Sequence, residues 1–164
     1  MPVLLQFCQW IYNTPFATAI RESQYMFPII ETIHTLGITL VVGTVAVLDL
    51  RLLGMLMKRE PVSRIARQTL PWTWIGFSIM LVTGLLLSAS EAATNYYNLA
   101  FRIKLLLLLL VGINPLIFHL TIYRSVDRWD LAPVTPVRAR AAAACSLILW
   151  TGIIVSGRMI AYLH

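Results

Sequence analysis

Charged residues are scarce in this sequence, and their scarcity argues against a soluble protein. Only 12% of the 164 residues are charged, whereas soluble domains carry about a quarter. Hydrophobic residues make up 59% of the chain, and the mean hydropathy is +0.77. Four membrane spans of about 20 residues would use most of this length and leave no room for a separate soluble catalytic domain. We therefore expect the protein to act in or at a lipid bilayer.

Cysteine is also nearly absent, and the two cysteines present, Cys8 and Cys145, show neither a CxxC pair nor metal-ligand spacing. We interpret both as buried or interfacial thiols. Basic patches interleaved with aromatic residues are missing as well, because the cations lie at the ends of apolar runs. The formal charge of +6 therefore does not indicate a nucleic-acid partner.

Long apolar segments dominate what is present, and they predict an all-α, integral membrane four-helix bundle. The whole chain, residues 1–164, is expected to form a single membrane domain. Residues 1–21 have apolar side chains at helical spacing and predict a helix lying in the membrane interface. Pro61 and Pro71 bracket a second short interfacial helix, predicted over 63–70. The four spans are predicted at about 27–57, 71–90, 99–123 and 139–162.

The distribution of cations predicts the orientation in the membrane. Nine of the 13 lysines and arginines lie in the connections after the first and third spans or at the adjoining helix ends. By the positive-inside rule this side is cytoplasmic, so both termini are predicted to be external. The nine residues are Arg51, Lys58, Arg59, Arg64, Arg67, Arg124, Arg128, Arg138 and Arg140.

Two acidic residues and two histidines lie inside the predicted spans, namely Glu31, His34, Asp49 and His119. Such residues are costly in hydrocarbon and therefore mark candidate functional positions. His34 lies outward of the middle of the first span, and His119 lies inward of the middle of the third. At about 1.5 Å per residue the two imidazoles differ in depth by about 20 Å. This separation excludes one haem ligated by both residues of one chain, and it fits two haems stacked across a membrane.

We therefore predict haem b, up to two per chain, with His34 ligating the iron of the outer haem and His119 that of the inner one. A second axial ligand is harder to find, because the other histidine is His164, at the chain end. Met159, at the depth of His34, is a candidate thioether ligand. The alternative for each histidine is a hydrogen bond to a neighbouring helix.

Arginines are predicted near the propionates that haem would bring. Arg158 lies at the depth of His34, and Arg51 and Arg124 lie near the cytoplasmic edge below His119. The alternative role for these arginines is pairing with acidic residues of the same chain, Arg51 with Asp49 for example.

In four segments the chain resembles a family of uncharacterised small bacterial four-span membrane proteins. The similar segments are Tyr25–His34, Leu48–Gly54, Pro71–Phe77 and Gly157–Tyr162, and the resemblance covers nearly the whole chain. It implies four spans in the bacterial inner membrane and no chemistry. In that membrane, the external side on which the cation count places both termini is the periplasm.

The layout is also loosely similar to four-helix membrane cytochromes b, whose haems sit between paired histidines on facing helices. This sequence has one histidine per level, which departs from that pattern. A homo-oligomer could supply the missing ligand from a neighbouring chain.

The sequence thus predicts a haem b membrane cytochrome that carries electrons across or within the membrane. An oxidoreductase variant would act on a quinone or another redox partner, with the edge near Trp72 and Trp74 as the place to look. A structural or assembly subunit of a membrane complex is the first alternative. The second is metal-ion handling or transport, whose candidate ligands are Glu31, His34, Glu91 and His164.

Overall fold

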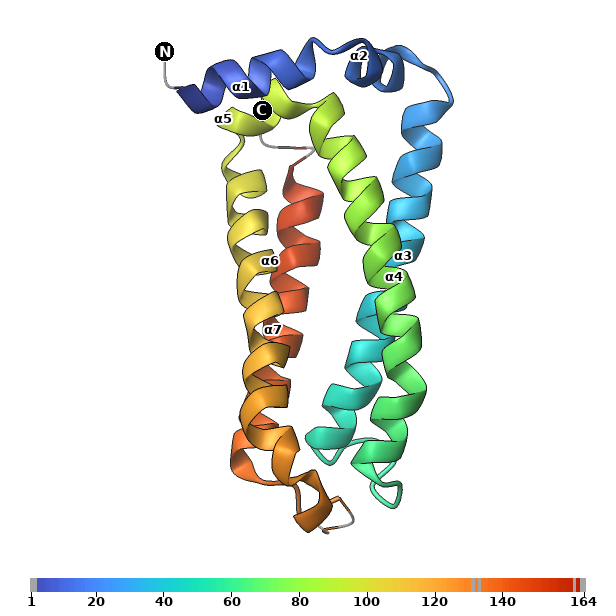
Figure 1. The fold of residues 1–164 in the computed structure, drawn as a ribbon, viewed down its shortest axis with the longest axis vertical. Helices are drawn as coiled ribbons and strands as arrows, with labels where there is room; N and C mark the ends of the chain where they lie inside the picture. The colour runs from blue at the N-terminus through green and yellow to red at the C-terminus, as the bar shows by residue number, and fades with distance from the viewer. Residues whose placement is uncertain (1–2, 131, 133, 161, 163–164) are drawn as a thin grey trace.

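The computed structural model describes residues 3–130, 132, 134–160 and 162, and it confirms the all-α fold class with four long apolar helices (Figure 1). Each of the four is long and apolar enough to cross a membrane. They are α3 (Met26–Leu52), α4 (Val62–Ser90), α6 (Leu99–Ile117) and α7 (Val137–Met159). Three short helices lie together at one end of the bundle, namely α1 (Val3–Tyr12), α2 (Pro15–Glu22) and α5 (Ala92–Tyr97).

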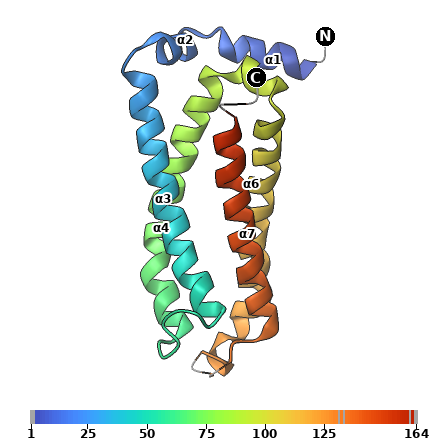
Figure 2. The same ribbon diagram turned by 180° about the vertical axis from the view of Figure 1, so that it is seen from behind.

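The four long helices form two antiparallel hairpins, α3 with α4 and α6 with α7. Packing of α3 against α7 joins the hairpins, and both helices face the viewer in Figure 2. A central core combines Val41, Met80, Val111, Trp150 and Ile153 from all four helices. This arrangement brings the first and third predicted spans into one bundle, with both running in the same direction.

The predicted N-terminal helix is two helices, because the chain breaks at Thr14 and Pro15. The Thr14 side chain accepts a hydrogen bond from the backbone N–H of Ala17 at 3.3 Å, which starts α2 as an N-cap. Arg21 then fixes α2 to the end of α4 by donating to the carbonyl of Ser90 at 3.0 Å. Helix α1 lies across the end of the bundle (Figure 1), as expected for an interfacial helix.

Helix α3 ends at Leu52, five residues before the predicted end of the first span. Gly54 adopts φ 72°, its N–H donates to the carbonyl of Arg51 at 3.0 Å, and the N–H of Met55 donates to Leu50 at 2.9 Å. These two bonds form a Schellman motif, which terminates a helix at a glycine. The apolar run continues beyond this point, so hydropathy alone placed the boundary too late.

Helix α4 is continuous from Val62 to Ser90 and contains Pro71, so the separate helix predicted at 63–70 is part of the second span. A proline removes a single backbone hydrogen bond, whereas unwinding a turn near hydrocarbon would expose several polar groups. The start of α4 is held by Asp130, whose carboxylate accepts from the backbone N–H of Ser63 at 2.8 Å and from its hydroxyl at 2.5 Å.

Helices α3 and α4 pack along a seam of small residues that we call the α3–α4 seam: Gly37, Val41 and Thr44 on one helix, Thr73, Gly76 and Met80 on the other. An added Cβ at Gly37 would lie 3.1 Å from the backbone nitrogen of Met80, and one at Gly76 would lie 2.9 Å from Cγ2 of Val41. The Thr73 hydroxyl donates to that of Thr44 at 2.9 Å. Glycine therefore allows the two backbones to approach closely, as in other membrane helix pairs.

The third span departs from regular α-helix after Pro115. Helix α6 ends at Ile117 and continues as the π-helix η1 (Phe118–Ile122) and the 3₁₀-helix η2 (Tyr123–Arg128). Asn114 donates to the carbonyl of Ala142 on α7 at 3.1 Å, and this hydrogen bond links the two helices. The fourth span is shifted slightly toward the N-terminus, since α7 covers Val137–Met159 rather than 139–162.

Candidate functional site

His34 continues the α3–α4 seam toward the end of the bundle where α1 lies. Its Nδ1 atom is 2.9 Å from the Thr83 hydroxyl, which donates its single proton to the carbonyl of Ile79 at 2.6 Å. With that proton used, the hydroxyl can accept from Nδ1, and the backbone of Met80 offers the imidazole a second hydrogen bond. This network favours the tautomer with the ring proton on Nδ1, in which the lone pair of Nε2 is available as a ligand.

Gly84 gives the imidazole of His34 its space. A Cβ added at Gly84 would lie 3.1 Å from Cε1 and 4.0 Å from Nε2 of His34. At Gly37 and Gly76, by contrast, the facing helix fills the space beside the glycine, which leaves no room for a macrocycle. These three glycines therefore have different surroundings.

Lys104 approaches the same place from the second hairpin. It acts electrostatically on His34, and a Cβ added at Gly157 on α7 would lie 3.6 Å from its Nζ atom. The lysine therefore rests between α6 and α7 rather than extending to the membrane surface. Leu107 and Leu108, one turn further along α6, pack against the central core, so Lys104 belongs to the interior face of its helix.

Arg158 and Met159 lie close to the end of α7 and are exposed, Met159 at 40%. The guanidinium of Arg158 lies 5.7 Å from the centre of the Tyr162 ring and 3.4 Å from its hydroxyl. The buried face of α7 carries Ile153 and Ser156 instead. The cation that the structure brings to His34 is therefore Lys104 and not Arg158.

His119 lies on η1 and is exposed at the other end of the bundle, where its ring stacks on Tyr123 with centroids 5.0 Å apart. Arg124 is exposed on the following turn. Gly112 is also exposed, and a Cβ added there would meet nothing within 4 Å. A ligand at His119 would consequently lie on the outer surface of a single bundle, not between its helices.

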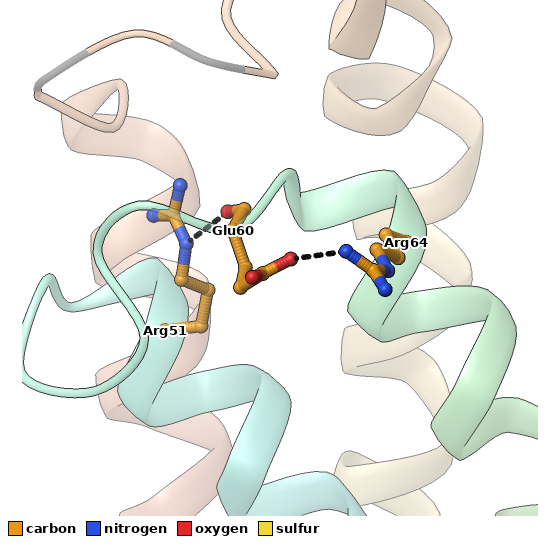
Figure 3. Close-up of polar contacts among 3 residues, drawn as sticks. All are labelled: Arg51, Glu60 and Arg64. Carbon is orange, nitrogen blue, oxygen red and sulfur yellow. Dashed lines mark hydrogen bonds and ion pairs between the residues drawn. The ribbon is translucent and has the colours of Figure 1, made fainter.

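Arg51 is buried, at 3% exposure, and holds the connection between α3 and α4 (Figure 3). Its Nε donates to the carbonyl of Glu60 at 2.8 Å, while the carboxylate of Glu60 pairs with Arg64 at 2.9 Å. Asp49 hydrogen-bonds Ser146 on α7, and within the described residues its Oδ2 atom has no hydrogen-bond partner. Arg51 thus has a structural role at a loop, and no ion pair with Asp49 is formed in the described part of the chain.

The metal-transport ligand set is not assembled by the described residues. No three histidine, cysteine, aspartate or glutamate side chains come together there in a way that could hold a metal ion. Glu31 is exposed on α3. His164 lies outside the described residues.

Together the fold and the His34 position define a class: a bundle of four apolar, membrane-length helices with a half-buried histidine held between α3 and α4. The chain belongs to DUF6644, described as a family of unknown function, whose family model matches residues 19–163. No curated protein and no solved structure matches it.

Proposed function

We propose that the protein is a haem b membrane cytochrome that carries electrons, with His34 as the axial ligand of an outer haem. The observation that supports this most is the contact between Nδ1 of His34 and the Thr83 hydroxyl, which favours the tautomer whose Nε2 can bind a metal. Metal-binding histidines in proteins nearly always donate their other ring N–H to such a partner. The same contact links α3 to α4, which was the alternative role expected for His34.

The surroundings favour a porphyrin over a bare metal ion. An ion at His34 would need further protein ligands, and no cluster of them is formed in the described part of the chain. A porphyrin brings four nitrogen ligands of its own and two negatively charged propionates. Lys104 offers a positive charge to such a group at the depth of His34.

The chain's own residues would bind and orient the cofactor, while haem, when bound, supplies one-electron redox chemistry. His34 would hold the iron, with Thr83 as its positioning residue. Gly84, which has no side chain, would leave room beside the imidazole ring. Lys104 would neutralise negative charge in an apolar environment. These roles set affinity and redox potential through the axial ligand, its hydrogen bond and the nearby charge.

A second, inner haem at His119 would require another copy of the chain. His119, Gly112 and Tyr123 offer one wall on the outside of the bundle, so the second wall and the second ligand would come from a homo-oligomer. Arg124 lies on the next turn, where it could meet a propionate. His34 at the outer site is held by residues of its own chain. Only the inner site would therefore depend on the formation of a homo-oligomer.

We place the protein in the bacterial inner membrane with α1, α2 and α5 on the periplasmic side, because the cation-rich connections lie at the opposite end. Cysteine labelling tests this orientation in a variant in which Cys8 and Cys145 are serine. With a membrane-impermeant maleimide, Tyr25→Cys (75% exposed) should react in intact spheroplasts, and Met57→Cys (50% exposed) only after permeabilisation. The reverse pattern would contradict the proposed topology.

The decisive measurement for the function is the reduced-minus-oxidised visible spectrum of the detergent-purified protein, with a pyridine haemochrome assay. We expect a haem b spectrum and about one haem per chain if the outer site alone is filled. A value near two in an oligomer would add the inner site. A colourless protein from haem-replete cells would reject the cytochrome and favour a structural or assembly role.

A further inference from the structure

A cavity of about 580 Å³ lies beneath α1, between the ends of α4 and α6. Its volume is within the range of sites that bind small organic ligands. The walls are mainly apolar and include Leu4 of α1, Phe101 and Leu105 of α6, and Ala92 of α5. Because α1 crosses the bundle at the predicted interface (Figure 1), this cavity lies where a lipid-soluble molecule would present a polar head.

Several polar side chains line the cavity without using their hydrogen-bonding groups, and three of them can bind the head of a ligand. Asn95, Tyr96 and Arg102 all contribute to the wall, and none of their side chains hydrogen-bonds or ion-pairs with another described residue. Each can donate a hydrogen bond, and two of the three are neutral. The set suits a ligand whose head carries uncharged oxygen acceptors and whose body is apolar.

The cavity adjoins the His34 position along α4. Ser88 lies in the cavity wall, and Gly84, which contacts His34, is one helical turn away, about 6 Å along the helix axis. On α6, Leu105 of the wall directly follows Lys104, which acts on His34. A redox-active ligand in this cavity would therefore lie beside the proposed haem.

We propose that this cavity is the binding site of an isoprenoid quinone, the electron-exchange partner of the cytochrome. The inference rests on the proposed haem function for its redox role, while the binding itself rests on the cavity. Quinone carbonyls accept hydrogen bonds from Tyr96, Asn95 and Arg102, and the tail leaves along the apolar wall into the bilayer. Oxidation of one quinol releases two electrons and two protons, so it reduces two ferric haem sites and yields the quinone.

The proposed quinone site is not the one that the sequence indicated, which was the edge near Trp72 and Trp74. The edge near Trp72 and Trp74 belongs to the part of α4 near Pro71, and both indoles are exposed, at 56% and 60%. It lies far along α4 from Gly84 and His34. A quinone at that edge would be remote from the outer haem, whereas the α1 cavity adjoins it.

The test measures binding of a short-tail ubiquinone analogue to the purified protein in phosphatidylcholine nanodiscs, by equilibrium dialysis. Tyr96→Phe and Arg102→Met each remove the hydrogen-bond donor of one side chain at the cavity, and each should weaken binding about tenfold. Trp72→Phe is the matched control and should leave the affinity unchanged. Unchanged affinity in both cavity variants, or loss in Trp72→Phe alone, would overturn the site.

Anaerobic addition of the reduced analogue then separates this proposal from the cytochrome. Reduction of two haems per quinol in the wild type, slowed in the cavity variants, would support both. Quinone binding with the expected variant pattern in a colourless protein would support the cavity and reject the cytochrome. A phospholipid that copurifies at Arg102 and that excess quinone does not displace would overturn the quinone assignment.

Discussion

His34→Ala should remove the outer haem, so that the haem content falls by the full equivalent assigned to that site. Among the described residues His34 is the imidazole on the α3–α4 seam, and the contact with Thr83 favours the tautomer with a free Nε2. His34→Gln is the better-folded companion, because an amide can still donate to Thr83 and fill the space beside Gly84. Both variants are checked by pyridine haemochrome per chain and by circular dichroism.

His119→Ala is the matched control for His34, since it removes an imidazole from an exposed position on the same bundle. It should leave the outer haem intact and remove haem only from oligomers that carry a second equivalent. If His34→Ala and His34→Gln both keep the full haem content and the wild-type spectrum, the axial ligand is assigned wrongly.

Thr83→Val distinguishes a positioning role from a packing role, because valine keeps the shape and removes the hydroxyl. Loss of a hydrogen bond to a metal-bound histidine commonly costs about 10–100-fold in metal affinity. The Met80 backbone remains as an acceptor, so we expect the lower end of that range, together with a shifted reduction potential. A purely structural Thr83 would change stability and leave the potential of the bound haem unaltered.

The architecture could be predicted from the sequence because apolar run length is a strong signal in a membrane protein. The boundaries were less predictable where local backbone chemistry decides them. Gly54 ends α3 inside an apolar run, so the end predicted from hydropathy was too late. Pro71 is tolerated inside α4, so the start predicted from this proline was also too late. The Gly54 signal was present in the sequence, whereas continuity through Pro71 depends on the cost of exposing backbone near lipid.

Of the candidate site, His34 could be predicted from the sequence, whereas its contacts with the residues around it could not, because helix packing brings them together. Thr83 lies 49 residues from His34, and only the packing of α3 on α4 pairs them. Lys104 could have been found from its spacing to Leu107, Leu108 and Val111, which marks the interior face of α6. For His119 a straight helical wheel does not apply, since the π-helical turn after Pro115 changes the angular position of later residues.

The α3–α4 seam should respond sharply to added volume, and Gly76→Leu is the strongest test of it. A Cβ at this position would already lie 2.9 Å from Val41 Cγ2 and 3.1 Å from its backbone nitrogen, so the two helices must separate. Overpacking of this kind typically costs about 1–3 kcal/mol, and a backbone neighbour cannot rotate away as a side chain can. We expect the variant to unfold at lower temperature or denaturant, measured by circular dichroism in detergent.

Gly43→Leu supplies the matched comparison, because Gly43 also lies in a long helix of the first hairpin and an added Cβ there meets nothing within 4 Å. It should leave stability unchanged or raise it slightly, since leucine has a higher helix propensity than glycine. Equal losses in the two variants would mean that the seam is not the contact that holds the hairpin. Since His34 continues this seam, Gly76→Leu should also weaken haem binding without touching the ligand, and Gly43→Leu should not.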